Sequence, residues 1–258
     1  MDSIYQHFRP DEREFIDQVL NWKQYVEDTY APKLTDFLDP GMQSIAAAII
    51  GTRNGIKIST FGGHPQSERK RMLLYPEYFT PEISDYNISL YEINYPAKFV
   101  TIEHRHVLGS LMSLGLKREK FGDILIRDAR IQFFLEQEMA RFVKMEFQQI
   151  GKTPIKLKET ALEEAIPVEE EWQEKPATAG SLRLDAILSS IYPISRQKAQ
   201  LLIGHGLVKV NWKTVEDPAF QCREGDYFSA RGYGRSRLIR VEGKTKKEKW
   251  RIVAGILK

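Results

Sequence analysis

A short acidic stretch divides this chain into two parts of opposite charge. Residues 159–174 contain seven acidic residues and no basic one, and Pro167, Pro176 and Gly180 lie in or just after this stretch. Residues 1–180 carry 22 basic and 28 acidic side chains, a net charge of −6, whereas residues 181–258 carry 16 and 7, a net charge of +9. Charged segments with proline and small residues favour a linker. We therefore expect an acidic linker at 159–180 and a separate basic domain at 181–258.

The composition excludes several classes of protein. An apolar fraction of 42%, with 11% aromatic residues, is enough to build packed cores. The longest apolar run, Ile45–Ile50, has six residues and is too short to span a bilayer, and the first 13 residues do not form a charged-then-apolar leader. The single cysteine, Cys222, excludes an internal disulfide and a multi-thiolate zinc site. These features predict a cytoplasmic protein that does not bind membranes.

Residues 1–80 are predicted to form a small α+β module. A helix capped by Asp11 is indicated by apolar residues at helical spacing, and a second helix is expected over 42–50. Residues 53–55 favour a hairpin turn into a strand over 56–61. The loop at 61–65, followed by Arg69, Lys70 and Arg71, is either a phosphate-contacting loop or an exposed turn beside solvated charges.

Residues 81–158 show the order of elements of a split βαβ domain, which RNA-recognition (RRM-like) sheets share with many domains that bind no nucleic acid. Nucleotide binding on such a sheet requires exposed aromatic side chains that stack on bases. Phe133 and Phe134 are adjacent on an expected strand, so one of them faces away from the helices unless a neighbouring domain buries it. The expected elements are strands over 88–95, 123–127, 131–135 and 154–157, and helices over 107–114 and 137–150.

The basic domain is predicted to contain two short helices followed by a small sheet. Ser181 and Ser195 suit the N-caps of the two helices, and Val208 and Val210 alternate with polar residues as in a strand. Arg196 and Lys198 stand in the first turn of the second helix, where acidic residues are usual and where two cations favour a phosphate site. Further strands are expected over 227–231, 236–241 and 250–257.

The spacing of these residues closely resembles the S4 RNA-binding domain over about residues 181–241. The matching residues are Leu182–Asp185, Ser195–Ala199, Gly206–Asn211, Lys213, Pro218, Gly225, Asp226 and Arg231. The resemblance implies binding of structured RNA, with the trailing strand positions matching less closely than the rest. The implied RNA contacts are Arg183, Ser195, Arg196, Lys198, Lys209, Asn211, Lys213, Arg231, Arg235 and Arg237.

The full order of parts looks like the YlmH family, supported by the weaker motifs Asp39–Gly41 and Phe61–Gly63. This resemblance implies a monomeric, ribosome-associated protein that binds rRNA or tRNA on the large subunit in ribosome-associated quality control or translation rescue. The family also carries a cell-division label, for which these residues give no physical support. It implies neither a cofactor nor catalysis.

The alternatives are an RNA-modifying enzyme, of the pseudouridine synthase or methyltransferase class, and a ribosome assembly factor. The sequence Arg183–Asp185 superficially fits a synthase loop, but the apolar spacing of the expected helix already explains Leu184. A methyltransferase needs a glycine-rich turn after a strand with an acid downstream, which residues 61–65 do not offer. His104 and His106 are two candidate metal ligands on one expected strand face, without a third partner. We therefore predict a non-enzymatic RNA-binding protein without a metal.

Overall fold

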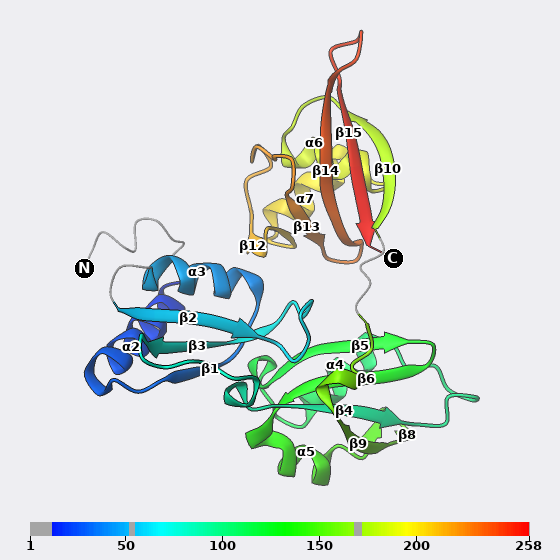
Figure 1. Ribbon diagram of the computed structural model, residues 1–258. Helices are drawn as coiled ribbons and strands as arrows, with labels where there is room; N and C mark the ends of the chain where they lie inside the picture. The colour runs from blue at the N-terminus through cyan, green and yellow to red at the C-terminus, as the bar shows by residue number, and fades with distance from the viewer. Residues whose placement is uncertain (1–11, 52–54, 168–171, 258) are drawn as a thin grey trace. The chain divides into compact units, whose positions relative to one another are not determined.

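The structure, a computed structural model, describes residues 12–51, 55–167 and 172–257. The chain forms two compact units, a first unit of residues 1–168 and a C-terminal unit of residues 169–258 (Figure 1). Both units combine helices with antiparallel sheets, as the α+β prediction requires. Two details of the sequence analysis, the cap at Asp11 and the turn at Arg53 and Asn54, lie outside the described residues.

In its described residues, the N-terminal module contains helices α2 and α3 and a three-stranded antiparallel sheet in the order β1-β3-β2 (Figure 1). Asp39 caps the second helix by accepting a hydrogen bond from the Met42 amide, and Gly51 ends it. The module has its own apolar core, to which the sheet and both helices contribute. Its elements are α2 (Arg13–Thr29), β1 (Lys33–Leu38), α3 (Pro40–Ile50), β2 (Ile56–Phe61) and β3 (Lys70–Pro76).

The middle part of the first unit has the expected split βαβ order, with its sheet in the order β5-β6-β4-β9. Asp128 and Ala129 both have positive φ, as a two-residue turn between β5 and β6 requires. The helix predicted over 137–150 is shorter, because residues 149 and 150 pair in a small hairpin instead. The elements are η2 (Ile83–Tyr86), β4 (Ile88–Asn94), α4 (His104–Ser113), η3 (Arg118–Lys120), β5 (Phe121–Arg127), β6 (Arg130–Glu136), η4 (Gln137–Met139), α5 (Ala140–Glu146), β7 (Gln149–Ile150), β8 (Thr153–Pro154), β9 (Lys156–Thr160) and η5 (Leu162–Glu164).

The middle sheet is buried on both faces. Phe133 lies in the core on the helical side, whereas Phe134 lies in a second cluster with Phe37 of the N-terminal module and Ile166. Both phenylalanines are 0% exposed. The Ile166 amide donates to the side chain of Gln132 on the same face, at 2.7 Å. The neighbouring module thus occupies the face on which an RRM-like sheet would stack bases.

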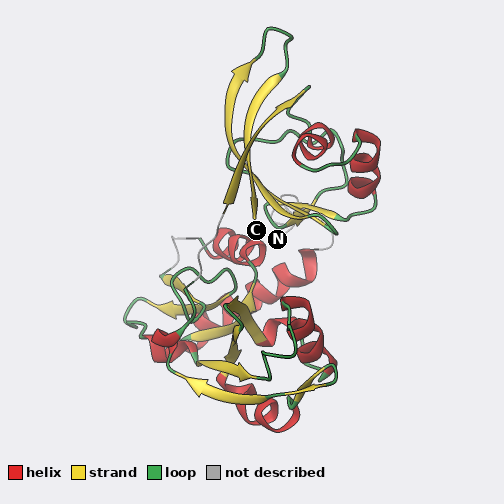
Figure 2. Cartoon of the chain, turned by 90° about the vertical axis from the view of Figure 1, so that its right-hand side faces the viewer, coloured by secondary structure: helices red, strands yellow, loops and turns green. Residues whose placement is uncertain are grey.

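The C-terminal unit packs two helices against a six-stranded antiparallel sheet in the order β10-β15-β14-β13-β11-β12. Both helices lie on one side of this sheet (Figure 2) and share one apolar core with it. Ser195 caps the second helix as predicted, but Arg183 rather than Ser181 occupies the N-cap of the first. The elements are β10 (Trp172–Ala179), α6 (Leu184–Ile191), α7 (Arg196–Gly204), β11 (Val208–Val210), β12 (Lys213–Thr214), β13 (Tyr227–Ala230), β14 (Gly234–Lys244) and β15 (Trp250–Leu257).

The expected linker at 159–180 is much shorter in the structure. Residues up to Ile166 pack on the middle sheet, and Trp172–Ala179 form β10, which pairs with β15 over its whole length. The basic domain therefore begins at β10 rather than at residue 181. Because β10 is an edge strand, Pro176 fits in it although proline signals a linker in the sequence.

Candidate RNA-binding surface

A buried carboxylate joins the starts of the two C-terminal helices. The side chain of Asp185 in α6 is 0% exposed. Its oxygens accept hydrogen bonds from Arg183 at 3.2 and 3.3 Å, from Arg196 at 3.0 and 3.3 Å, and from the Gln200 amide at 2.8 Å. The side chains of Arg183 and Arg196 remain 36% and 53% exposed, so both arginines contact Asp185 and are also partly open to solvent.

Hydrogen bonding controls the ionisation of Asp185. Burial by itself raises the pKa of this carboxyl, but the bonds from Arg183, Arg196 and Gln200 outweigh burial and hold the pKa well below its usual range. The carboxylate therefore stays charged at neutral pH. It fixes both arginines at the positive ends of α6 and α7, where an anionic ligand is also favoured.

Ser195 and Lys198 have separate roles at the start of α7. The Ser195 hydroxyl accepts a hydrogen bond from the Lys198 amide at 3.1 Å, so it acts as the N-cap. The Lys198 side chain is exposed in the first turn of the helix. Of these two predicted contacts, Lys198 is the one whose side chain is placed to reach a phosphate.

Asn211 stabilises the turn between β11 and β12. Its side chain accepts from the Tyr227 amide at 2.9 Å and donates to the Asp226 carboxylate at 2.8 Å. Lys213 pairs with Val210 across this turn, and so lies on the helical side of the sheet. The side chain of Asn211 is thus engaged within the protein, which gives a structural reason for an asparagine at this position.

Three of the predicted contacts lie on the opposite side of the sheet from the helices. Lys209 pairs with Ser229, which pairs with Arg235, so the three side chains form one row across β11, β13 and β14. Arg237 lies 4.7 Å from the ring centre of Tyr227, with which it pairs. Arg231 is exposed in the turn between β13 and β14, and its amide donates to the Leu207 carbonyl.

The ten residues predicted from the sequence therefore do not form one surface. Arg183, Arg196 and Lys198 form what we call the helical face, at the starts of α6 and α7. Lys209, Arg235 and Arg237 belong to what we call the outer face of the sheet. The sequence analysis missed Gln200, which completes the Asp185 cluster, and Trp212, whose ring lies 5.3 Å from Tyr227. A polar residue four positions after Arg196, one helical turn on, was the available signal for Gln200.

The basic loop of the N-terminal module is structural. Arg71 is 4% exposed and donates to the carbonyls of Thr35, Tyr86 and Asn87, while Arg69 donates to the Phe37 carbonyl. These guanidinium groups are thus engaged within the protein, and the phosphate-contacting interpretation of this loop is not supported.

A buried carboxylate also holds the same loop. Asp123 accepts hydrogen bonds from the amides of Glu68 and Arg69, at 2.6 and 3.1 Å. Burial raises the pKa of the Asp123 carboxyl although both hydrogen bonds lower it. This loop joins the N-terminal module to β5 of the middle sheet.

The remaining candidates for catalysis offer no reactive group. Cys222 is buried, and burial followed by the nearby Asp226 raises the pKa of its thiol to about 12. His106 lies in α4 rather than on a strand, and its Nδ1 accepts from the Glu103 amide. Within residues 12–51, 55–167 and 172–257, no group of three or more histidine, cysteine or acidic side chains is placed to hold a metal.

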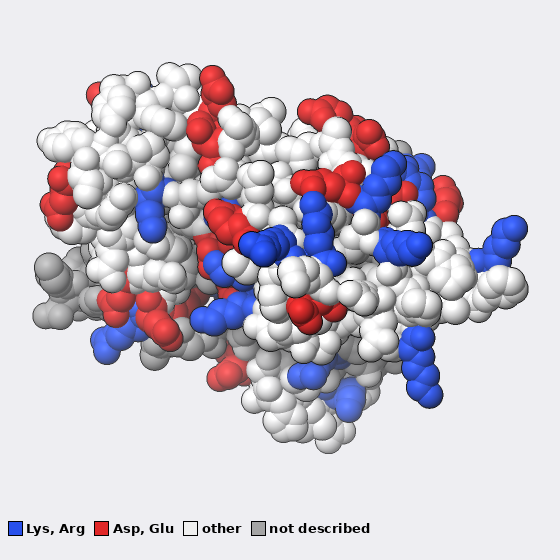
Figure 3. All heavy atoms as spheres, turned by 90° about the horizontal axis from the view of Figure 1, so that it is seen from below, with Lys and Arg blue, Asp and Glu red and all other residues white. Residues whose placement is uncertain are grey.

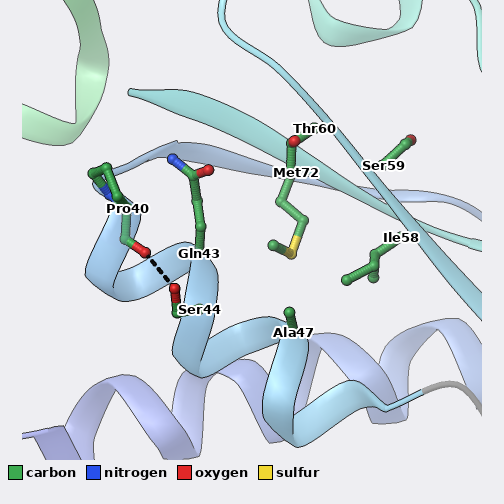
Figure 4. A pocket seen from close by; sticks show the side chains of 8 residues that line it. All are labelled: Pro40, Gln43, Ser44, Ala47, Ile58, Ser59, Thr60 and Met72. Carbon is green, nitrogen blue, oxygen red and sulfur yellow. Dashed lines mark hydrogen bonds between the residues drawn. The ribbon is translucent and has the colours of Figure 1, made fainter. Parts of the chain in front are cut away.

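A groove of about 410 Å³ lies between α3 and β2 (Figure 4). None of its eight lining residues is titratable, so the lining provides no acid or base that could activate the hydroxyls of Ser44, Ser59 and Thr60. The Ser44 hydroxyl there donates to the Pro40 carbonyl within α3. The lining residues are Pro40, Gln43, Ser44, Ala47, Ile58, Ser59, Thr60 and Met72.

The face of the molecule drawn in Figure 3 carries charges of both signs. Lysine and arginine side chains lie among aspartate and glutamate on this face. None of the helices in the described part of the chain is both long and apolar enough to cross a bilayer.

Comparison with known proteins places these observations in a family. Family models match residues 11–79 ("YlmH, N-terminal"), 81–164 ("Putative RNA-binding domain in YlmH") and 182–226 ("S4 domain"). The chain is 47% identical over 252 residues to the ribosome-associated protein quality control protein P2 of Bacillus subtilis (strain 168), covering 98% of each chain. It is also similar to the solved structure of the cell division protein ylmH from Streptococcus pneumoniae, with 39% identity, a TM-score of 0.55, and coverage of 63% of this chain and 99% of that one.

Proposed function

This chain belongs to the YlmH family, and on that basis we propose that it is a non-enzymatic protein that binds structured RNA on the ribosome. The relative from Bacillus subtilis is named for ribosome-associated quality control, and we propose the same process for this chain. In this proposal it acts as a monomer in the cytoplasm on large subunits that carry peptidyl-tRNA.

The observation that carries this proposal is the Asp185 cluster. One buried carboxylate fixes Arg183 and Arg196 at the starts of two helices, and both side chains stay partly exposed. Preorganised arginines at helix N-termini match phosphate oxygens in geometry and charge. Lys198, in the same first turn of α7 as Arg196, extends the helical face.

The first unit has a different proposed role. Its middle sheet buries Phe133 and Phe134, so neither ring is available to stack on an RNA base. Its basic loop uses Arg69 and Arg71 within the protein. We therefore assign to the first unit the positioning of the C-terminal unit on the ribosome, through surfaces other than this sheet.

The experiment measures co-sedimentation of the purified chain with large ribosomal subunits at several salt concentrations. The variant Lys198→Gln with Arg231→Gln removes two exposed cations and leaves the Asp185 cluster intact. Each lost phosphate contact lowers the slope of log K against log salt by about one, so this variant should bind more weakly and with a slope lower by about two.

The matched control is Lys246→Gln with Lys247→Gln, which removes the same charge at the exposed tip of the β14–β15 hairpin. We expect the control to bind as the wild type does. Equal binding by the test variant, or a flat salt response of the wild type, contradicts the proposed contacts of Lys198 and Arg231 with RNA and points to a protein partner.

The two alternatives have their own outcomes in this design. An assembly factor would bind precursor subunits in preference to mature subunits that carry peptidyl-tRNA. An RNA-modifying enzyme would leave an rRNA nucleotide unmodified in cells that lack this protein. Either result replaces the proposal of a quality-control binder.

A further inference from the structure

The outer face of the C-terminal sheet carries a cluster of aromatic rings. Trp212 lies 5.3 Å from Tyr227, with the rings 31° apart, and Trp172 lies 5.7 Å from Tyr227 at 73°. The three rings come from β10, β13 and the turn after β11, and all three side chains are half-buried. Tyr227 therefore joins segments that are far apart in the sequence into one aromatic surface, on the side of the sheet that faces away from α6 and α7.

Cations surround these rings. Arg237 lies over Tyr227 at 4.7 Å, and Lys209 and Arg235 form the next row of the same face, two positions along the strands. The Nε atom of Arg237 is buried, and no group in the described part of the chain accepts its hydrogen bond. The Arg237 side chain as a whole is half-buried, so part of it stays open to a ligand.

Two further arginines extend the face along β14 and β15. Arg240 and Arg251 are exposed there, and among the described residues Glu174 and Glu242 lie within 4 Å of Arg240. In the described part of this face, the lysine and arginine side chains outnumber these two acids. A phosphate backbone is the complementary partner for such a surface.

Trp212 occupies a backbone position that a tryptophan rarely adopts. Asn211 and Trp212 form the two-residue turn between β11 and β12, and both have positive φ, 49° and 66°. Such turns favour asparagine followed by glycine, because a side chain at the second position is strained. Asn211 already secures the turn through Asp226 and the Tyr227 amide. The indole ring is thus held in place at a cost in backbone strain, and residues with such strained backbones cluster at ligand sites.

We propose that this outer face binds single-stranded RNA, with its rings stacking on unpaired bases and its cations holding the phosphates between them. Combined rings and cations match a single strand better than a duplex, whose bases are already stacked, and better than an acidic peptide, which has no bases to stack. This inference rests on the proposed function and deepens it. Beside the helical face, which binds phosphates, the chain would have a second RNA-binding face that also stacks on bases.

The test uses the full chain and two RNA probes, decauridine and a stable hairpin of similar charge. Binding is followed by fluorescence anisotropy of labelled RNA and by quenching of tryptophan fluorescence. The variant Trp212→Gly suits the turn conformation and removes the ring. Loss of one stacked base should weaken decauridine binding about tenfold and remove most of the quenching, while hairpin binding changes less than twofold.

Further variants distinguish the effect of losing a stacked ring from the effects of losing charge or of unfolding. As a charge control, Lys247→Gln removes one cation at the hairpin tip and should leave decauridine binding within twofold of the wild type. Arg237→Gln removes a cation from the outer face and should lower the salt slope for decauridine by about 0.7, the value for one phosphate contact on a single strand. An unchanged thermal transition of the C-terminal unit in Trp212→Gly shows that the sheet stays folded.

The outcomes distinguish this inference from the proposed function. Unchanged decauridine binding in both outer-face variants overturns the inference, as does equally tight binding of a decaglutamate peptide, which would show that the partner is an acidic protein segment. Neither result changes the expected effect of Lys198→Gln with Arg231→Gln on binding to large subunits, which tests the proposed function. Loss of that binding alone, with decauridine binding intact, supports two separate faces.

Discussion

Replacing Asp185 by asparagine removes one charge at the point where α6 and α7 begin. The buried carboxylate accepts hydrogen bonds from Arg183, Arg196 and Gln200 over 2.8–3.3 Å. An asparagine keeps the size of the side chain but presents an amide NH₂ to these donors. We expect the variant to lose both the attraction and the fixed orientation of the two arginines.

The size of the effect follows from burial and screening. Removing one partner of a fully buried ion pair costs about 3–5 kcal/mol. The two arginine side chains are 36% and 53% exposed, and therefore reach water once the carboxylate is gone. We reduce the cost accordingly to about 2–3 kcal/mol. For a unit of this size, that loss lowers the Tm by roughly 10–20 °C.

Differential scanning calorimetry of the full chain measures this prediction, because the two units should give separable transitions. Only the transition of the C-terminal unit should move. The control Glu242→Gln removes the same charge from an exposed pair, 3.9 Å from Arg240, and should change the free energy of unfolding by less than about 1 kcal/mol.

The pH dependence gives a second check on Asp185. Its pKa in the folded protein lies below that of an unfolded aspartate, about 3.9. The carboxylate therefore stabilises the fold above about pH 4, and this contribution is lost as the pH falls further. The difference between wild type and variant should be complete at pH 7 and shrink below pH 4. A variant transition within about 3 °C of the wild type at pH 7 refutes this reasoning.

Two other predictions concern the packing of each unit. Gly63 has a φ of 94°, and a Cβ there would lie 2.3 Å from the buried ring of Phe134. Gly63→Ala should therefore destabilise the first unit by about 3 kcal/mol, measured by urea denaturation, and a wild-type midpoint would show that the loop can move away from the ring. Cys222 has a buried thiol whose pKa is raised to about 12. Its reaction with a disulfide reagent at pH 8 should be at least a hundredfold slower in the native protein than in 6 M guanidinium, and rapid native labelling would contradict its burial.

Local patterns were sufficient to predict the elements that depend on near neighbours. The S4-type helices follow from apolar residues at helical spacing and from Ser195, whose cap the structure confirms. The order of elements in the middle domain was likewise predictable from alternation and from the turn at Asp128 and Ala129. In each case the deciding interactions span only a few residues.

The features that the sequence analysis misplaced depend on partners that are distant in the chain. The acidic stretch predicts a linker, but Trp172–Ala179 pairs with a strand more than 70 residues away. The basic loop predicts a phosphate site, but Arg71 is satisfied by carbonyls of Thr35 and Tyr86. The predicted RNA contacts divide between two faces because strand register, which spacing alone does not give, sets where each side chain points.

The pairing of β10 with β15 has a consequence for how the protein is made. Translation delivers β10 first, yet its hydrogen-bonding partner emerges only after the two helices and four intervening strands. Until then β10 has no partner on its own sheet, and the helices lack part of the core that β15 supplies through Ile252 and Ala254. Contacts of such high sequence separation form slowly. The C-terminal unit should therefore complete its fold only after β15 has emerged, so that a nascent copy lacks the finished sheet until then.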